Sequence, residues 1–319
     1  MSLRKLLLAP LEKLLSIADP AEQIRIQRET SMVKYAQMGL RHFLSLPQEH
    51  AFATAQAGLH SYKRLLQRGT LPVDTPQLPP VVSEVTQRLQ HGSCMLALPF
   101  NLSTLQLLRT LPADLARRSI VIESQAVVNA ITAMSSPNKA LQTMPPRDVI
   151  KRVKAARTDG SAPVLYISFP ELHTRGNGTT ASLNFLGKSC TFSLLEPLLY
   201  CFGLQTMLTL APSPDRASTL QLLQFEGAET DGPNAGKALA LCMGWLSGNL
   251  QNMAQAFPEL TLSWQHLYRA SGQFRALERN DKLKQLEAYF DAWRQAGPEL
   301  DAQTYAFVKS RLTEMRNSH

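Results

Sequence analysis

The stretch CMLALPFNLSTLQLL, residues 94–108, joins a short apolar run to a segment whose leucines recur at helical spacing. Its first five residues are typical of a buried strand, and residues 102–111 are predicted to form a helix. The alternation continues, because SIVIE (119–123) and VLYISF (164–169) have the pattern of strands and residues 146–157 have that of a helix. Strands that alternate with helices predict an α/β core with mostly parallel strands.

The rest of the chain adds helices around this core. Two further strands are predicted at 205–210 and 219–225, followed by a helix at 235–256. The predicted fold is therefore α/β, a mixed and mostly parallel sheet flanked by helices, with helical extensions at both ends. We divide the chain into an N-terminal helical region, a proline-rich linker, the α/β core and a C-terminal helical extension: 1–68, 69–82, 83–271 and 272–319.

The net charge favours an anionic binding partner, and the motifs in the sequence predict no cofactor. A net charge of +8 suits nucleic acid, an anionic membrane surface or an acidic protein. Basic residues are not interleaved with aromatic ones, and no zinc-finger or helix-turn-helix spacing is present, so we do not expect nucleic-acid binding. No glycine-rich phosphate loop or nucleophile elbow occurs, so no cofactor is expected. The cysteines form no Cys-x-x-Cys pair, which predicts buried free thiols, a reducing compartment and no metal site: Cys94, Cys190, Cys201 and Cys242.

No apolar segment is long enough to span a membrane. The first 15 residues carry leucines at helical spacing beside basic residues, which predicts an amphipathic helix. That helix either packs on the core of the protein or lies on a membrane surface. We therefore expect a cytoplasmic protein, with at most peripheral contact with the inner membrane.

The segment RDVIKRVKAAR, residues 147–157, predicts an amphipathic helix with a basic outer face. Such a face is either simply solvated or docks an acidic or phosphate-bearing partner. The candidate partner-binding residues on this face are Arg147, Lys151, Arg152, Lys154 and Arg157.

Two regions carry a family resemblance. The segment NLQNMAQAFPELTLSWQHLYRA (249–270) resembles the end of the catalytic domain of the lipid A biosynthesis acyltransferases, with their Pro-Glu turn and Trp-x-His-x-x-Arg-like signature at Pro258, Glu259, Trp264, His266 and Arg269. Residues 148–210 are similar in the order of their elements: a basic helix, a strand, an acidic turn, a Phe-x-Gly-like turn (NFLGK) and a helix leading to the next strand. The resemblance implies a lysophospholipid-acyltransferase-like fold in a bacterial protein that handles acyl carrier protein or acyl-CoA.

The same resemblance implies a lost catalytic dyad. Members of the family carry His-x-x-x-x-Asp/Glu directly after the first core strand, where the imidazole deprotonates the acceptor hydroxyl and the carboxylate orients it. Here the histidine falls on Pro99 and the carboxylate on Thr104, and none of the seven histidines has Asp or Glu five residues on. The family arginine after the next strand is replaced by Glu123. Loss of a general base costs about 10²- to 10⁴-fold in rate.

Three functions remain open. In the first, which we expect, the protein is a degenerate acyltransferase that binds an acyl chain or acyl carrier protein. In the second, Glu171 and His173 form a replacement acid/base pair and the protein is a divergent acyltransferase; otherwise His173 is a surface loop residue. In the third, the protein is a partner subunit of a lipid or acyl-product pathway, and the apolar stripe of LKQLEAYFDAW (283–293) is an interface rather than core.

Overall fold

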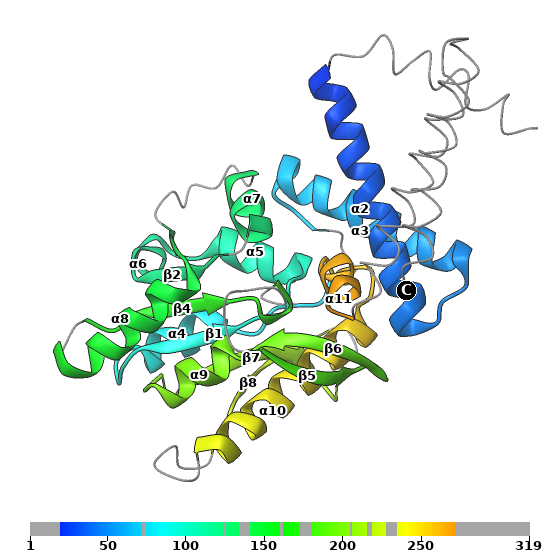
Figure 1. Cartoon of the computed structure of the whole chain (residues 1–319). Helices are drawn as coiled ribbons and strands as arrows, with labels where there is room; N and C mark the ends of the chain where they lie inside the picture. The colour runs from blue at the N-terminus through cyan, green and yellow to red at the C-terminus, as the bar shows by residue number, and fades with distance from the viewer. Residues whose placement is uncertain are drawn as a thin grey trace, which may run out of the picture.

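A six-stranded sheet forms the centre of the protein (Figure 1). Its order is β3-β2-β4-β1-β7-β8, with all neighbours parallel except β8, which runs antiparallel to β7. The predicted α/β class with a mostly parallel sheet is thus confirmed. The strands are β1 (Cys94–Ala97), β2 (Ser119–Ile122), β3 (Gln142–Met144), β4 (Leu165–Ser168), β7 (Met207–Pro212) and β8 (Leu220–Gln224). The computed structural model describes residues 20–71, 75–123, 125–133, 141–159, 162–172, 180–204, 206–215, 219–227 and 235–271.

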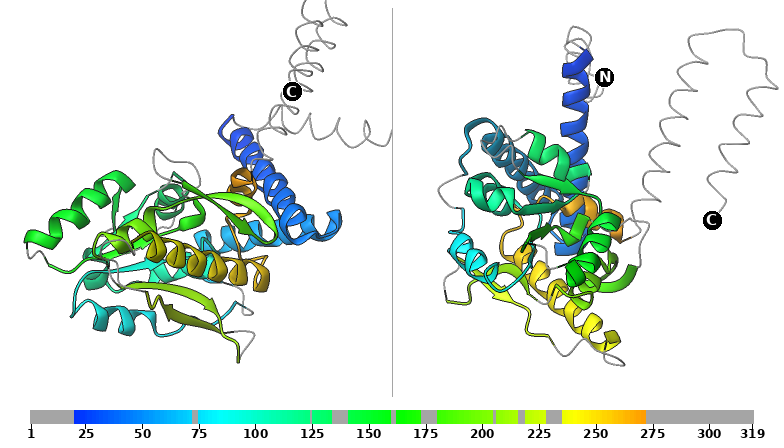
Figure 2. Two further views of the ribbon diagram at one scale, coloured as in Figure 1. Left: turned by 60° about the horizontal axis from the view of Figure 1, so that its bottom comes forward. Right: turned by 90° about the vertical axis from the view of Figure 1, so that its left-hand side faces the viewer.

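Helices cover both faces of the sheet (Figure 2). Alternate residues of each strand point to opposite faces, so that Leu96 and Ile167 pack against one helical layer while Met95 and Tyr166 pack against the other. The first layer comprises α4 (Val81–Arg88), α5 (Leu102–Thr110), α6 (Ala113–Arg117) and α7 (Gln125–Ala133). The second comprises α8 (Pro146–Asp159), α9 (Leu195–Cys201) and α10 (Ala235–Ala256).

A third group of elements packs together beside the sheet. It consists of α2 (Pro20–Leu44), α3 (Gln48–Arg68), α11 (Trp264–Ala270) and the hairpin of β5 (Thr180–Phe185) and β6 (Lys188–Ser193). The hairpin turns at Leu186 and Gly187, which both have positive φ angles, 51° and 77°. Positive φ at both central residues is the geometry that follows the twist of a hairpin, and it confirms the turn predicted from NFLGK.

Two glycines allow α2 to approach the first residue of α11 and α3 to approach the segment before that helix. A Cβ atom on Gly39 would lie 2.5 Å from the carbonyl oxygen of Trp264, and one on Gly58 would lie 2.9 Å from that of Glu259. Both distances are shorter than contacts between real carbon and oxygen atoms, so only glycine fits at these positions.

The predicted proline-rich linker lies against the core where it is described. Leu71, Pro76 and Val81 are buried. The carbonyl of Gln77 accepts a hydrogen bond of 3.0 Å from the N–H of Leu220 at the edge of the sheet. The segment therefore covers part of the outer edge of β8.

The remaining predictions fall partly inside and partly outside the described residues. The four cysteines are free thiols; Cys94, Cys190 and Cys242 are buried and Cys201 is half-buried. The predicted amphipathic helix of the first 15 residues and the apolar stripe at 283–293 lie outside the described residues. Among the helices within the described ranges, none combines the length and the apolar character needed to cross a bilayer.

Candidate functional site

The carboxyl ends of β1 and β4 form a topological switch point in the sheet. The chain leaves β1 toward the layer that contains α5 and leaves β4 toward the opposite layer, which contains α9. In open α/β sheets, ligands bind in the crevice that opens where neighbouring connections diverge in this way. The structure brings three of the predicted site residues together here, namely Pro99, Thr104 and Glu171.

Pro99 and Thr104, the two positions predicted to correspond to the dyad, are joined by a hydrogen bond. The Thr104 hydroxyl donates to the Pro99 carbonyl at 2.7 Å and lies 2.9 Å from the carbonyl of Asn101. The Thr104 N–H in turn donates to the side-chain oxygen of Asn101 at 2.9 Å, which completes a capping box at the start of α5. Both Asn101 and Thr104 are buried. These residues therefore begin a helix, and neither offers a base.

Glu171 lies in a short 3-10 helix, Pro170–Leu172, directly after β4. One carboxyl oxygen accepts a hydrogen bond of 2.6 Å from the backbone N–H of Phe100, and the other accepts one of 3.1 Å from the hydroxyl of Ser263. Glu171 is 1% exposed. Burial raises the pKa of its carboxyl to about 7, although the hydrogen bonds from Phe100 and Ser263 lower it in part. Glu171 therefore links β1, β4 and the segment before α11.

A later part of the chain covers the crevice. Residues 257–263 connect α10 to α11 and cross the start of α5. The N–H of Leu262 donates to the carbonyl of Phe100 at 3.0 Å, and Asn101 forms an antiparallel bridge with Thr261. The backbone of residues 257–263 therefore lies directly against the start of α5.

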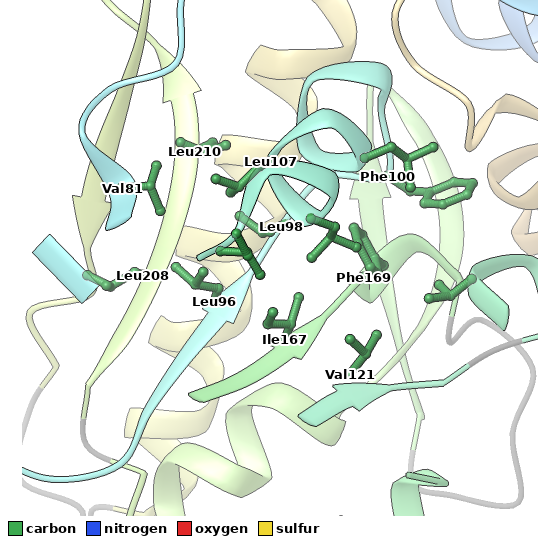
Figure 3. Packing of buried hydrophobic residues seen from close by; sticks show 14 of the residues in the cluster. Val81, Leu96, Leu98, Phe100, Leu107, Val121, Ile167, Phe169, Leu208 and Leu210 are labelled. Carbon is green, nitrogen blue, oxygen red and sulfur yellow. The ribbon is translucent and has the colours of Figure 1, made fainter. Parts of the chain in front are cut away.

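Aromatic and aliphatic side chains pack beneath this cover. The rings of Phe100 and Phe169 meet edge to face with their centroids 5.4 Å apart. Figure 3 shows both rings beside Leu98 and Ile167, in the cluster that lies between the sheet and α5. All four residues are buried.

The second predicted catalytic residue is not described. His173 falls in the range 173–179, outside the described residues. Glu171 uses both carboxyl oxygens in hydrogen bonds to its own protein. The replacement acid/base pair stays a prediction.

The predicted basic helix is present as α8. Val149 and Val153 are buried against the sheet, and Arg147 and Lys151 are exposed on the outer side. Lys151 lies 3.5 Å from Asp148, an exposed pair that contributes little to stability. The amphipathic pattern predicted from the sequence is therefore confirmed.

Two cations of α8 contact the protein itself. The Nζ atom of Lys154 lies 4.1 Å from the centre of the Phe202 ring. Arg152 hydrogen-bonds to Tyr166 and lowers its pKa, although burial raises that pKa more strongly. Arg157 belongs to α8, but its side chain lies outside the described residues. The cations best placed for an outside partner are therefore Arg147 and Lys151.

The sequence analysis missed two further cations near α8. Arg117 and Arg118 end α6 immediately before β2, and both are exposed. The guanidinium of Arg118 lies 3.4 Å from the carbonyl of Pro163, in the connection between α8 and β4. Their adjacency in the sequence was a signal, but only the parallel pairing of β2 with β4 places Arg118 beside the connection that follows α8.

The family-signature residues lie around the cover of the crevice. The Trp264 indole N–H donates to the carbonyl of Pro258 at 2.8 Å and closes the turn that carries Glu259. Burial and the nearby Arg269 guanidinium lower the pKa of His266 to about 4, so its imidazole is neutral at pH 7. These residues hold the segment before α11 in place.

A small cleft lies on the outer side of this cover, between α2, α3 and residues 258–265. Its walls are mostly apolar and include Val33, Leu59, Tyr62 and Trp264. The volume is about 40 Å³, whereas pockets for small ligands measure about 300–1,000 Å³. An acyl chain would not fit in it without movement of the helices.

Metal ligands and similar proteins add no further assignment. Within the described ranges, no three His, Cys, Asp or Glu side chains gather in a way that could hold a metal ion. No protein-family model matches the chain, and no curated protein matches it either.

Proposed function

We propose that this protein is a catalytically degenerate member of the acyltransferase class, which acts by binding an acidic acyl carrier protein rather than by transferring the acyl group. One observation carries the proposal. The positions at which the family keeps its base and carboxylate, Pro99 and Thr104, are joined by a hydrogen bond, and Thr104 also forms the capping box of α5 with Asn101. The crevice above them is covered by residues 257–263.

The exposed cations of α8 support the choice of partner. Arg147 and Lys151 are exposed on α8, and Arg117 and Arg118 are exposed at the end of α6. Acyl carrier proteins are acidic, and complementary charges steer association and select the partner. A docked carrier could present its acyl chain to a further protein, so a role as a partner subunit is compatible with this proposal.

The first test measures binding and turnover together. The full chain is mixed with acyl carrier protein that bears a thioester-linked acyl group, and binding is followed by fluorescence anisotropy at two salt concentrations. We expect binding that weakens with salt, and no loss of the thioester in the presence of hydroxyl or amine acceptors. Thioester loss that disappears in the Glu171→Gln variant would contradict the proposal and favour the divergent enzyme.

A matched pair of variants locates the docking surface. Arg147→Glu with Lys151→Glu reverses two exposed charges on α8, and Arg41→Glu with Lys237→Glu makes the same change in net charge on exposed positions of α2 and α10. We expect the first pair to weaken binding by about tenfold or more and the second pair by less than about threefold. Equal losses in the two double variants would show that only net charge matters. Binding of anionic vesicles with the same dependence on α8 would instead identify a peripheral membrane contact.

A further inference from the structure

A second buried carboxyl group lies on the opposite face of the sheet from the crevice. Glu196 belongs to the first turn of α9 and is 0% exposed. Neither of its carboxyl oxygens makes a hydrogen bond. A fully buried acid without a well-formed hydrogen bond is rare, because burial removes the water that would stabilise an ionised carboxylate.

Polar groups lie around Glu196, but none of them forms a hydrogen bond to its carboxyl oxygens. Ser168 ends β4, is fully buried and has a hydroxyl without a hydrogen bond. The hydroxyl lies near enough to influence the Glu196 carboxyl without forming a well-aligned hydrogen bond to it. Cys242 of α10 lies close enough to interact electrostatically with the Glu196 carboxyl. The same thiol also interacts electrostatically with Cys201 and Tyr200 of α9. All of these neighbours are neutral at pH 7.

The free energy of packing α9 against the sheet therefore depends on the protonation state of Glu196. Burial raises the pKa of the carboxyl to about 7, and its own backbone N–H and Ser168 lower it by less. Below that pH the neutral acid can remain against β4. Above it, the closed arrangement must hold an unpaired charge, whereas an open arrangement would expose that charge to water.

We propose that Glu196 is a proton-controlled latch: protonated, it allows α9 to lie against the end of β4, and ionised, it favours release of α9 from the sheet. Release would affect a neighbouring element, since Phe202, directly after α9, supports the ammonium group of Lys154 on α8. The latch stands independently of the proposed docking function, because it depends only on contacts within the chain.

Hydrogen exchange of the intact protein tests the latch. Peptides that cover residues 194–204 are followed at about pH 6 and about pH 8.5, with exchange rates corrected for the intrinsic effect of pH. For a carboxyl with a pKa of about 7 when closed and 4.5 when open, the opening equilibrium should rise about tenfold between these conditions. Peptides from β1 serve as an internal reference, because the opening is local.

The protein contains a matched control in Glu171. This acid is equally buried but has hydrogen bonds to both oxygens. Glu196→Gln should abolish the pH dependence of exchange in α9, and Glu171→Gln should leave it in place. Exchange in α9 that does not change with pH in the natural protein, or that changes equally in Glu196→Gln, would overturn the proposal.

A measurement without a variant covers the case in which Glu196→Gln does not fold. The carboxyl carbon of Glu196 in the natural protein is titrated by NMR. A transition near neutral pH supports the latch, and a transition near the ordinary value for glutamate, about 4.3, overturns it.

Discussion

The hydroxyl of Thr104 donates a hydrogen bond of 2.7 Å to the carbonyl of Pro99. The bond joins the segment after β1 to the first turn of α5, where Thr104 also forms the capping box with Asn101. It therefore stabilises the connection between β1 and that helix.

Replacement of Thr104 by valine should destabilise the protein. The change keeps the shape of the side chain but removes the hydroxyl, which leaves the buried carbonyl of Pro99 with one hydrogen bond fewer. We expect a loss of about 1–2 kcal/mol in the free energy of unfolding, measured with urea. Thr110→Val is the control, because the Thr110 hydroxyl is exposed at the end of the same helix; an equal loss in both variants would argue against a special role for Thr104.

Alanine at Gly39 should disturb the packing of α2 against the start of α11, and alanine at Gly58 that of α3 against the segment before α11. The new methyl group would collide with the carbonyl oxygen of Trp264 or Glu259. We expect each change to cost about 1–3 kcal/mol of stability and to lower the melting temperature measured by calorimetry. Gly244→Ala is the control, since a Cβ there meets no atom within 4 Å, and alanine in a helix should stabilise by up to about 1 kcal/mol. Unchanged stability of the Gly39 and Gly58 variants would show that the helices are not tightly packed here.

Stability should fall as the pH rises above neutral. Glu171 and Glu196 have pKa values of about 7 in the folded protein, above the ordinary value of 4.5. The folded protein therefore binds more protons than the unfolded chain, and this stabilisation is fully present below 4.5 and lost as the pH rises through 7. Between about pH 6.5 and 8.5 we expect each acid to contribute a loss of about 1 kcal/mol. Urea unfolding over that range checks the slope, which should be smaller in Glu171→Gln.

Through His266, the free energy of unfolding should instead fall as the pH drops below about 6.5. Its pKa is about 4 in the folded protein, below the ordinary value of 6.5. The stabilisation it contributes is therefore present above pH 6.5 and lost as the pH falls through 4. Relative to a His266→Gln variant, the natural protein should lose about 1–2 kcal/mol between about pH 6.5 and 4.5. A constant difference between the two proteins over this range would mean that the imidazole is solvated.

The central strands and the helix α10 were predictable from local patterns. The apolar runs of β1, β2 and β4 are buried as central strands of the sheet, as their patterns predicted. The helix α10 has the predicted bounds, Ala235–Ala256. The elements that were missed are short: α6, α7 and β3 have five, nine and three residues, and the hairpin strands β5 and β6 have six each. Such segments form because neighbours in the fold support them, and their own sequences carry a weak signal.

The candidate site was only partly predictable. The sequence indicated Pro99, Thr104 and Glu171 as residues of interest, but the hydrogen bond between Glu171 and Ser263 joins positions 92 residues apart. No local pattern reports such a pairing. Glu196 interrupts the apolar stretch of residues 192–210, and an acid in such a stretch is a sign that its side chain is buried.

The bond between Glu171 and Ser263 also has a consequence for the growing polypeptide. Glu171 leaves the ribosome 92 residues ahead of Ser263, an interval of roughly 5–18 seconds at ordinary rates of synthesis. During that interval the carboxyl end of β1 lacks its cover, and Phe100 and Phe169 are open to chaperones or to neighbouring nascent chains. Translation, rather than the strands alone, thus sets the moment at which the middle of this sheet becomes protected.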